Sequence, residues 1–199
     1  MVKPKILVLV LAVAAMVSAC AQPPLPEDHF YRLQVTTSPT PLARPPLAGV
    51  LEVGRFVADG LTAGRPIVYS QSGQPHALSE YHYHFWVEAP TVLLRDQLVT
   101  QLRAAKVARS VVTPEMRVDP DFVLSGKIKR LERVVGATPL AVVELELAVR
   151  QTASNSLAFL HTYRVEEAVA ADSVADAVAA INKALGAIYA KFTADLQRL

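Results

Sequence analysis

AVVELELAVR, residues 141–150, decides the fold because apolar and charged side chains alternate along it. Every odd-numbered residue from Val143 to Val149 is apolar, whereas Glu144 and Glu146 fall on the opposite face of an extended strand. We interpret these two glutamates as the solvent-facing side of a strand rather than as a carboxylate pair for acid–base catalysis.

The two neighbouring segments, residues 119–134 and 157–169, alternate in the same way. Three consecutive long segments of this kind predict an antiparallel meander with one covered face. Shorter strands are predicted for residues 30–35, 49–57 and 65–70.

Two helices are predicted beside these strands. Pro90 suits the first turn of a helix, and Leu94, Leu98 and Leu102 then recur every four residues. From Val174 to Leu196, apolar residues recur every three or four positions. The predicted order is four strands, a helix, four strands and a helix, which is typical of the α+β class: a mostly antiparallel or mixed β-sheet covered by two main helices in a single domain.

The N-terminal residues resemble an export signal. Lys3 and Lys5 precede an apolar run of twelve residues, 6–17, and small residues then lead to Cys20, the only cysteine. The run is shorter than the ~20 residues of a membrane-spanning helix, which is the alternative interpretation. The cysteine has no partner for an intramolecular disulfide.

Val17-Ser18-Ala19-Cys20 resembles a bacterial lipobox. We therefore expect residues 1–19 to be a lipoprotein signal peptide and Cys20 to carry the acyl chains, such as palmitate, that anchor the mature protein stably to a membrane. The alternative is an ordinary signal peptide with an incidental thiol. In similar Gram-negative lipoproteins an aspartate after the cysteine favours the inner membrane, and Ala21 therefore favours the periplasmic face of the outer membrane.

Seven prolines between Ala21 and Pro46 favour extended backbone. We divide the mature chain into residues 20–46, which hold the lipidated cysteine, a proline-rich tether and the first short strand, and a domain of residues 47–199. Removal of Lys3 and Lys5 leaves 18 Lys and Arg against 18 Asp and Glu, and we expect no nucleic-acid partner for such a neutral chain.

No catalytic motif is present: the sequence has no GxSxG, phosphate-binding glycine loop or HExxH. We predict that the protein is not an enzyme and has no cofactor. His82 and His84 are the candidate metal ligands, but zinc sites usually need three or four protein ligands, and we expect no metal site. Lys127, Lys129, Arg130 and Arg133 form a basic cluster that we interpret as the solvated face of a strand.

The segment SEYHYHFWVEAP, residues 79–90, carries aromatic side chains on both faces of its predicted strand. Strict alternation would place Tyr81, Tyr83 and Phe85 on one face. It would place His82, His84 and Trp86 on the other. We expect both faces to be covered, and the candidate contacts with a partner protein are Tyr81, Tyr83, Trp86 and Arg130.

The order of these motifs is similar to that in the ABC-type transport auxiliary lipoproteins. It runs from the lipobox cysteine through HFYRL, GVLEVGRFVADGL, GRPIVYS, YHYHFWVEAP and LLRDQLVTQL to the terminal helix. The resemblance implies an auxiliary-lipoprotein domain, a partner complex of an MCE-domain protein with an ABC permease and ATPase, and homo-oligomers. It also implies a role in docking the periplasmic conduit of a lipid transport system at the outer membrane. The alternatives are an envelope-assembly or cell-wall regulatory lipoprotein and a direct periplasmic lipid carrier.

Overall fold

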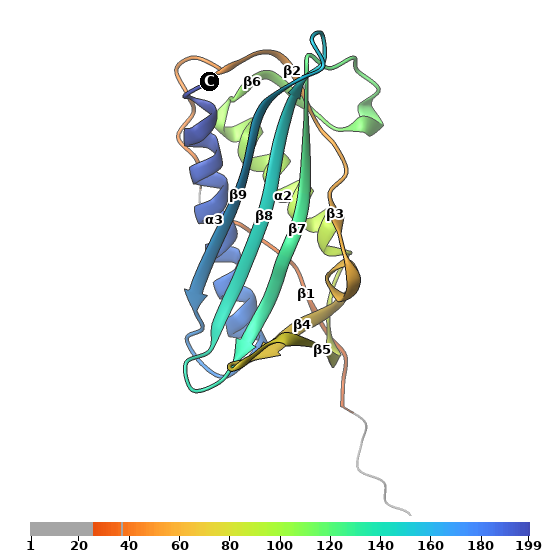
Figure 1. The fold of residues 1–199 in the computed structure, drawn as a ribbon, viewed down its shortest axis with the longest axis vertical. Helices are drawn as coiled ribbons and strands as arrows, with labels where there is room; N and C mark the ends of the chain where they lie inside the picture. The colour runs from red at the N-terminus through yellow and green to blue at the C-terminus, as the bar shows by residue number, and fades with distance from the viewer. Residues whose placement is uncertain (1–25, 37) are drawn as a thin grey trace, which may run out of the picture.

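The computed structural model describes residues 26–36 and 38–199, and the predicted signal peptide and Cys20 lie outside the described residues. The strands are β1 (His29–Tyr31), β2 (Leu47–Val53), β3 (Val57–Ala58), β4 (Pro66–Gln71), β5 (Gln74–Trp86), β6 (Ala108–Val112), β7 (Phe122–Val135), β8 (Leu140–Gln151) and β9 (Ser156–Ala168). The helices are α2 (Pro90–Ala105) and α3 (Val174–Leu196), with 3-10 turns η2 (Gly60–Ala63) and η3 (Pro114–Met116) (Figure 1).

Strand β7 is the centre of the sheet. One of its edges pairs antiparallel with β8 over almost its whole length, from Phe122↔Gln151 to Val134↔Leu140, and β8 pairs antiparallel with β9. The predicted meander is therefore confirmed. The other edge of β7 pairs in turn with β2, β3 and β4, all parallel to it.

The sheet of the described residues has nine strands and two wings beyond β7. At one end β2 pairs parallel with β6, and at the other β4 pairs antiparallel with β5, which in turn pairs parallel with β1. Parallel and antiparallel pairs both occur, so the predicted α+β fold with a mixed sheet is confirmed.

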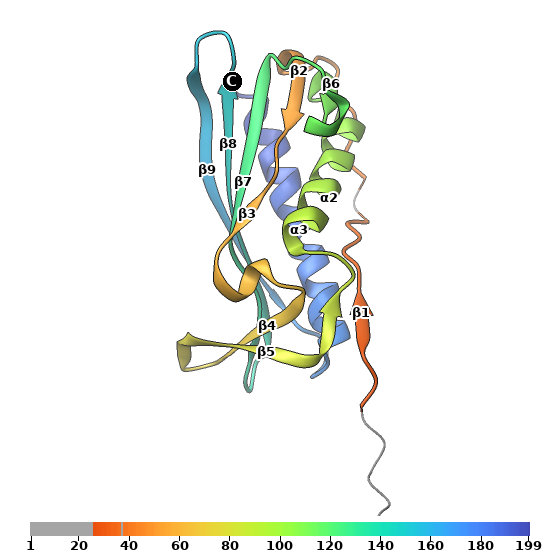
Figure 2. The same cartoon turned by 90° about the vertical axis from the view of Figure 1, so that its right-hand side faces the viewer.

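Both helices lie on one face of the curved sheet (Figure 2). The inward residues of β8, including Val143, Leu145 and Leu147, are fully buried against Ile181 and Leu185 of α3 and their neighbours. Each such side chain stabilises the fold by roughly 1.5–3 kcal/mol. Alternation in β8 and the helical period in α3 thus produce one shared core.

Local signals set the ends of both helices. Pro90 is the first residue of α2, and the hydroxyl of Ser173 accepts a 3.0 Å hydrogen bond from the backbone N–H of Asp176 in the first turn of α3. Tyr189 of α3 donates its hydroxyl proton to the carbonyl of Leu94, at 2.9 Å, and so joins the two helices. Burial raises the pKa of Tyr189.

The predicted strand of residues 49–57 is divided in the structure. β2 ends at Val53, the N–H of Gly54 turns to donate to the carbonyl of Leu124 at 2.8 Å, and β3 begins only at Val57. Phe56 between them is buried over Gly126, where a Cβ atom would stand 2.6 Å from its ring. Burial of this one aromatic side chain therefore interrupts the extended pattern.

The structure joins the segment from His29 to Val35 to the domain. β1 pairs with β5, and Leu33 and Val35 are buried in the shared core. β1 and the β4–β5 hairpin lie at one end of the molecule, which we call the tether end (Figures 1 and 2). The β8–β9 turn and the C-terminus lie at the opposite, distal end.

Candidate functional site at the tether end

A corner in β5 shapes the aromatic segment. Pro66 of β4 faces Phe85, but Val68 already faces Glu80, so a single residue of β4 is opposite four residues of β5. Such a bulge bends a strand and breaks its alternation. The first part of β5 pairs with β4, and its last three residues turn to pair with β1 (Figure 2).

The predicted division of the aromatic side chains between two faces is therefore wrong. Tyr81 packs inward against the core, whereas Tyr83, which alternation places on the same face, is 38% exposed. His82 is exposed and Trp86 is buried, although alternation assigns them a common face as well. The bulge, which a period of two cannot describe, is the physical reason.

Trp86 belongs to the core. It is only 2% exposed. The backbone N–H of Trp86 donates a hydrogen bond to the carbonyl of Arg65 at 2.7 Å, and the carbonyl of Trp86 accepts one from Nε of Arg65 at 3.0 Å. The prediction that Trp86 contacts a partner is corrected here, because its indole is covered by the chain's own residues.

Tyr81 is held by a buried arginine. Nη1 of Arg133 donates to the Tyr81 hydroxyl at 2.9 Å, and Nη2 of the same guanidinium pairs with Asp172 just before α3. Tyr69 of β4 lies against the Tyr81 ring, with centroids 4.5 Å apart. Burial raises the pKa of Tyr81, and the nearby positive charge of Arg133 opposes this shift.

His84 contacts two residues of β1 and, in its own strand, the ring of Tyr81 at 5.5 Å. Its ring stacks on that of His29 with centroids 5.0 Å apart, and its Nδ1 shares a 2.9 Å hydrogen bond with the hydroxyl of Tyr31. Burial and the neighbouring His29 lower the pKa of His84. Across residues 26–36 and 38–199, no three His, Cys, Asp or Glu side chains are arranged to hold a metal ion.

The pairing of β1 with β5 is an aromatic ladder. His29, Phe30 and Tyr31 lie opposite His84, Phe85 and Trp86 in parallel register. The rings of Phe30 and Phe85 stack at 5.8 Å, and the guanidinium of Arg65 lies 5.7 Å from the centroid of Phe30. Sequence reasoning missed this contact, although the similar tripeptides HFY and HFW were a signal that could have suggested it.

Arg130 and the other basic residues of β7 divide between two faces. A register shift between Ile128 and Arg130 directs Arg130 outward, where it pairs with Glu132, and leaves Arg133 facing inward, 4% exposed. Lys129 lies 3.9 Å from a carboxylate oxygen of Glu144. The exposed pair of Lys129 contributes little to stability. The carboxylate of Glu132, by contrast, is buried and also accepts a 3.2 Å hydrogen bond from the hydroxyl of Ser70. The sequence predicted Arg133 as part of this basic cluster, but its side chain is buried on the inward face of β7.

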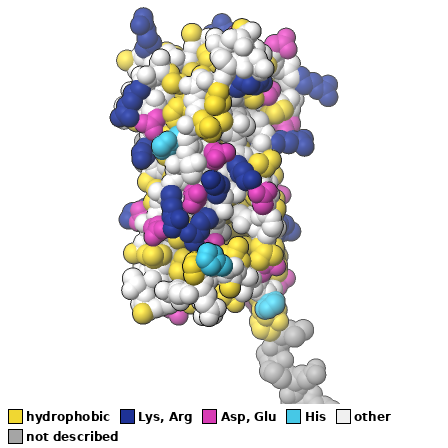
Figure 3. All heavy atoms as spheres, viewed as in Figure 1, with side chains coloured by type: hydrophobic (Ala, Val, Ile, Leu, Met, Phe, Trp, Pro, Cys, Tyr) yellow, Lys and Arg dark blue, Asp and Glu magenta, His cyan; other side chains and the backbone are white. Residues whose placement is uncertain are grey.

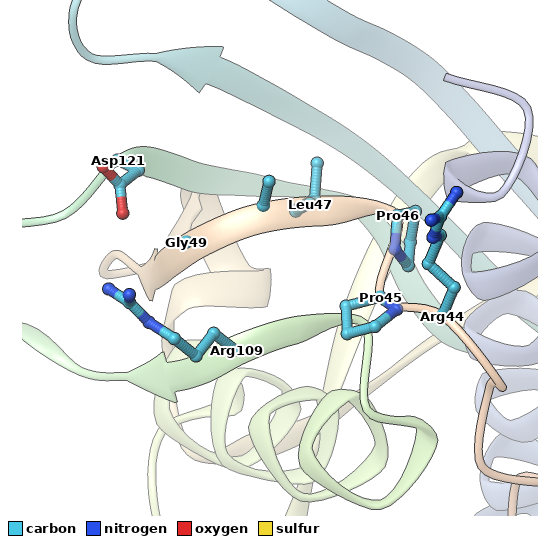
Figure 4. A pocket seen from close by; sticks show the side chains of 8 residues that line it. Arg44, Pro45, Pro46, Leu47, Gly49, Arg109 and Asp121 are labelled. Carbon is cyan, nitrogen blue, oxygen red and sulfur yellow. The ribbon is translucent and has the colours of Figure 1, made fainter.

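Three surface hollows accompany these elements. The largest, about 710 Å³, lies between β2 and β6, but its charged side chains Arg44, Arg109 and Asp121 do not converge on one point (Figure 4). Asp121 is engaged in accepting a 2.7 Å hydrogen bond from the N–H of Val50. The second, about 500 Å³, lies at the tether end beside Phe85, and the third, about 440 Å³, lies at the distal end beside Leu160.

The model of the ABC-type transport auxiliary lipoprotein component matches residues 31–191. The chain belongs to this family. Its members are auxiliary components of ABC-type transport, and the resemblance predicted from the motif order is confirmed.

Several solved structures of other proteins have a fold similar to that of this ABC-type transport auxiliary lipoprotein. A protein from Xanthomonas campestris is 21% identical, with a TM-score of 0.71 over 82% of this chain and 91% of that one. An uncharacterized protein is 16% identical, with a TM-score of 0.64 over 87% and 98%. A hypothetical protein from Chlamydia trachomatis is 10% identical, with a TM-score of 0.51 over 76% and 99%. No curated protein sequence matches the chain.

The auxiliary lipoprotein fold gives the chain a tether end and a distal end with different surfaces. At the tether end aromatic rings of β1 and β5 are stacked, and at the distal end Leu157 and Leu160 of β9 are more than half exposed. None of the described helices is long and apolar enough to span a membrane. In the described part of the chain, the two ends thus present apolar surfaces that are open to contact.

Proposed function

We propose that the protein is an outer-membrane lipoprotein facing the periplasm, anchored through acyl chains on Cys20, and a non-enzymatic auxiliary component of an ABC/MCE-type lipid transport system. Its role is to dock the periplasmic conduit, an MCE-domain protein that works with an ABC permease and ATPase, at the outer membrane.

The observation that carries this proposal is the opposite placement of β1 and the distal half of β9 (Figure 1). An anchor at Cys20 joins the domain just before His29, at the tether end. The β8–β9 turn then points away from the anchoring membrane, toward a conduit that approaches from the periplasm. A docking protein needs such separate ends for the membrane and for its partner.

The edge of β9 has the chemistry of a docking strand. Among the described residues β9 pairs only with β8, so its other edge carries backbone N–H and C=O groups without a strand partner. Residues 164–168 of this edge carry Arg164, Glu166 and Glu167, which discourage pairing. Residues 156–161 carry no Asp, Glu, Lys or Arg, and Leu157 and Leu160 are 58% and 54% exposed.

The occupant that this edge fits is an extended segment of the MCE-domain partner with apolar side chains at alternate positions. Its backbone would add a strand beside residues 156–161, and one side chain would enter the hollow lined by Phe159, Leu160 and Leu199. Tyr83 of β5 and Arg130 of β7, which the sequence predicts as partner contacts, lie outside this edge and remain predictions.

Site-specific photocrosslinking in cells tests the docking. A photoreactive amino acid at Leu160 is expected to capture the MCE-domain protein, and the same probe at Arg164, also exposed on β9, is expected to capture much less. Probes at Tyr83 and Arg130 test the contacts predicted from the sequence. Docking is rejected when none of these positions captures a component of the transporter.

Two further measurements test the anchor and the assembly. Mass spectrometry of the mature protein should find acyl chains on Cys20, and Cys20→Ser should release the protein from the membrane fraction. Homo-oligomers, which the family resemblance predicts, should appear as crosslinks between two copies and as a multiple of the monomer mass in light scattering. A freely soluble wild-type chain would contradict the anchor.

A further inference from the structure

The exposed aromatic side chains gather at one end of the molecule. Of the large hydrophobic side chains that are exposed among the described residues, the aromatic ones are Phe30 and Tyr83, which are 56% and 38% exposed. Both lie on the β1–β5 pair, and the exposed hydrophobic residues of the distal end are aliphatic. The two ends therefore differ in the kind of apolar group that they present.

These side chains belong to one apolar surface. Phe30 stacks on Phe85, and Phe85 lines the hollow of about 500 Å³ together with Leu61 and Leu78, which are 37% and 42% exposed. Tyr83 lies on the adjoining corner of β5. We call this set, Phe30, Leu61, Leu78, Tyr83 and Phe85, the tether-end aromatic surface. Figure 3 shows hydrophobic side chains gathered at this end, on either side of a histidine.

The length of the tether limits how far this surface can move from an anchored cysteine. The nine peptide steps from Cys20 to His29 span at most about 30 Å when fully extended. As an extended, proline-rich segment they would span roughly 28 Å, close to that limit. Because Phe30 follows immediately, the tether-end aromatic surface is held next to the membrane surface.

We propose that the tether-end aromatic surface lies on the bilayer that holds the anchor, with its rings at the level of the lipid headgroups. Tyrosine favours this interface because its ring is apolar and its hydroxyl stays hydrated, and the neighbouring phenylalanine and leucine side chains add apolar area. The proposal rests on the proposed function only for the anchor at Cys20. It gives the domain a fixed orientation on the membrane instead of free movement on a tether.

The charges around the surface select the kind of lipid. The segments that carry it have more acidic than basic side chains, namely Glu27, Asp28, Glu80 and Glu88 against Arg32 and Arg65. Negatively charged lipid surfaces attract basic segments, and they would repel the acidic segments that carry the tether-end aromatic surface. Contact is therefore made with zwitterionic headgroups, and added salt does not weaken it.

The experiment uses the mature chain, residues 20–199, coupled through its single cysteine to a maleimide lipid in phosphatidylcholine vesicles with brominated acyl chains. This coupling anchors the protein whether or not cells lipidate Cys20, so failure of the contact and failure of the anchor are separate results. Tyr83→Trp reports on the proposed surface, and the matched control Leu160→Trp reports on the distal end. The wild-type emission of buried Trp86 is the baseline.

The expected result is at least about twofold stronger bromolipid quenching at position 83 than at position 160, because only interfacial residues approach the acyl chains. Addition of 0.5 M salt should leave this quenching unchanged, and phosphatidylglycerol should not increase it. Equal quenching at the two positions overturns the proposal. Quenching that requires phosphatidylglycerol overturns the choice of zwitterionic lipid. Blue-shifted emission from the Tyr83→Trp variant that bromolipid does not quench assigns the surface to a protein contact instead.

Discussion

Nη1 of Arg133 lies 2.9 Å from the hydroxyl oxygen of Tyr81 and donates a hydrogen bond to it. The bond joins the inward face of β7 to the corner of β5, two segments separated by 52 residues. Nε of the same guanidinium is buried without a partner among the described residues, so the guanidinium depends on Tyr81 and Asp172 for its remaining bonds.

Tyr81→Phe should therefore destabilise the fold. Loss of an acceptor from a buried, charged donor costs about 1–3 kcal/mol. Urea denaturation followed by circular dichroism measures the free energy of unfolding. Tyr69→Phe is the control, because the Tyr69 ring lies on Tyr81 while its hydroxyl is not bonded to Arg133. Equal losses in the two variants would show that ring contacts, not the hydrogen bond, are the cause.

Trp86→Ala should lower the free energy of unfolding by about 3–5 kcal/mol, since it leaves a large cavity in the core. The milder Trp86→Phe, which keeps an aromatic ring, should lose less. Urea midpoints of both variants provide the measurement. A Trp86→Ala protein of normal stability that fails to bind a partner would contradict the core assignment.

Gly126→Ala should cost about 1–3 kcal/mol, because the new methyl group would overlap the ring of Phe56 at 2.6 Å. Ser125→Ala, an exposed change one residue away, should stay within about 0.5 kcal/mol of the wild type. Thermal unfolding of the three proteins compares them. The crossing of Phe56 over β7 is disproved when the two variants melt alike.

Acidification should destabilise the tether end through His84. Its pKa is lowered in the folded protein by burial and by His29, so the unfolded chain binds a proton more readily as the pH falls through about 6.5. Stability is unaffected by this group above that range and decreases below it. The groups that face it are Tyr31 and His29 of β1 and Tyr81 of its own strand.

The measurement is the urea midpoint of the wild type and of His84→Gln from pH 7.5 to 5.5. The variant retains a hydrogen-bonding side chain but does not titrate, and its midpoint should fall less on acidification. Every other residue is the same in the two proteins, so the difference between the two curves isolates His84. Parallel curves would remove His84 as the cause.

The sequence predicts best where a repeating pattern coincides with a single environment. β8 alternates because one face meets the core and the other meets water, and α3 keeps its period because one side packs on the sheet throughout. The five-residue β6 received no predicted range of its own. Five residues are too few for an alternating pattern to distinguish a strand from a loop. The position of β6 in the sheet depends on its pairing with β2, which is distant in sequence.

The candidate site was predicted less well because its geometry depends on contacts between distant residues. The corner of β5 arises from a register shift against β4. It separates Tyr81 from Tyr83, and His82 from Trp86, although alternation places each pair on one face. His29 and Tyr31, which contact His84, come from β1, and Tyr31 lies 53 residues before it in the chain. Alternation describes a strand's own residues and carries no information about what lies beside it.

The parallel register of β1 and β5 has a mechanical consequence. The proposed anchor at Cys20 would pull on β1 from its N-terminal end, whereas β5 continues from its C-terminal end into α2 and is held from the opposite direction (Figure 2). Force along the tether therefore shears the pair, and it loads the stacked rings and the 2.8 Å bond from the N–H of Val87 to the carbonyl of Tyr31 together instead of one after another. Three residues of strand can in this way serve as the clamp through which the membrane bears the load of the whole domain.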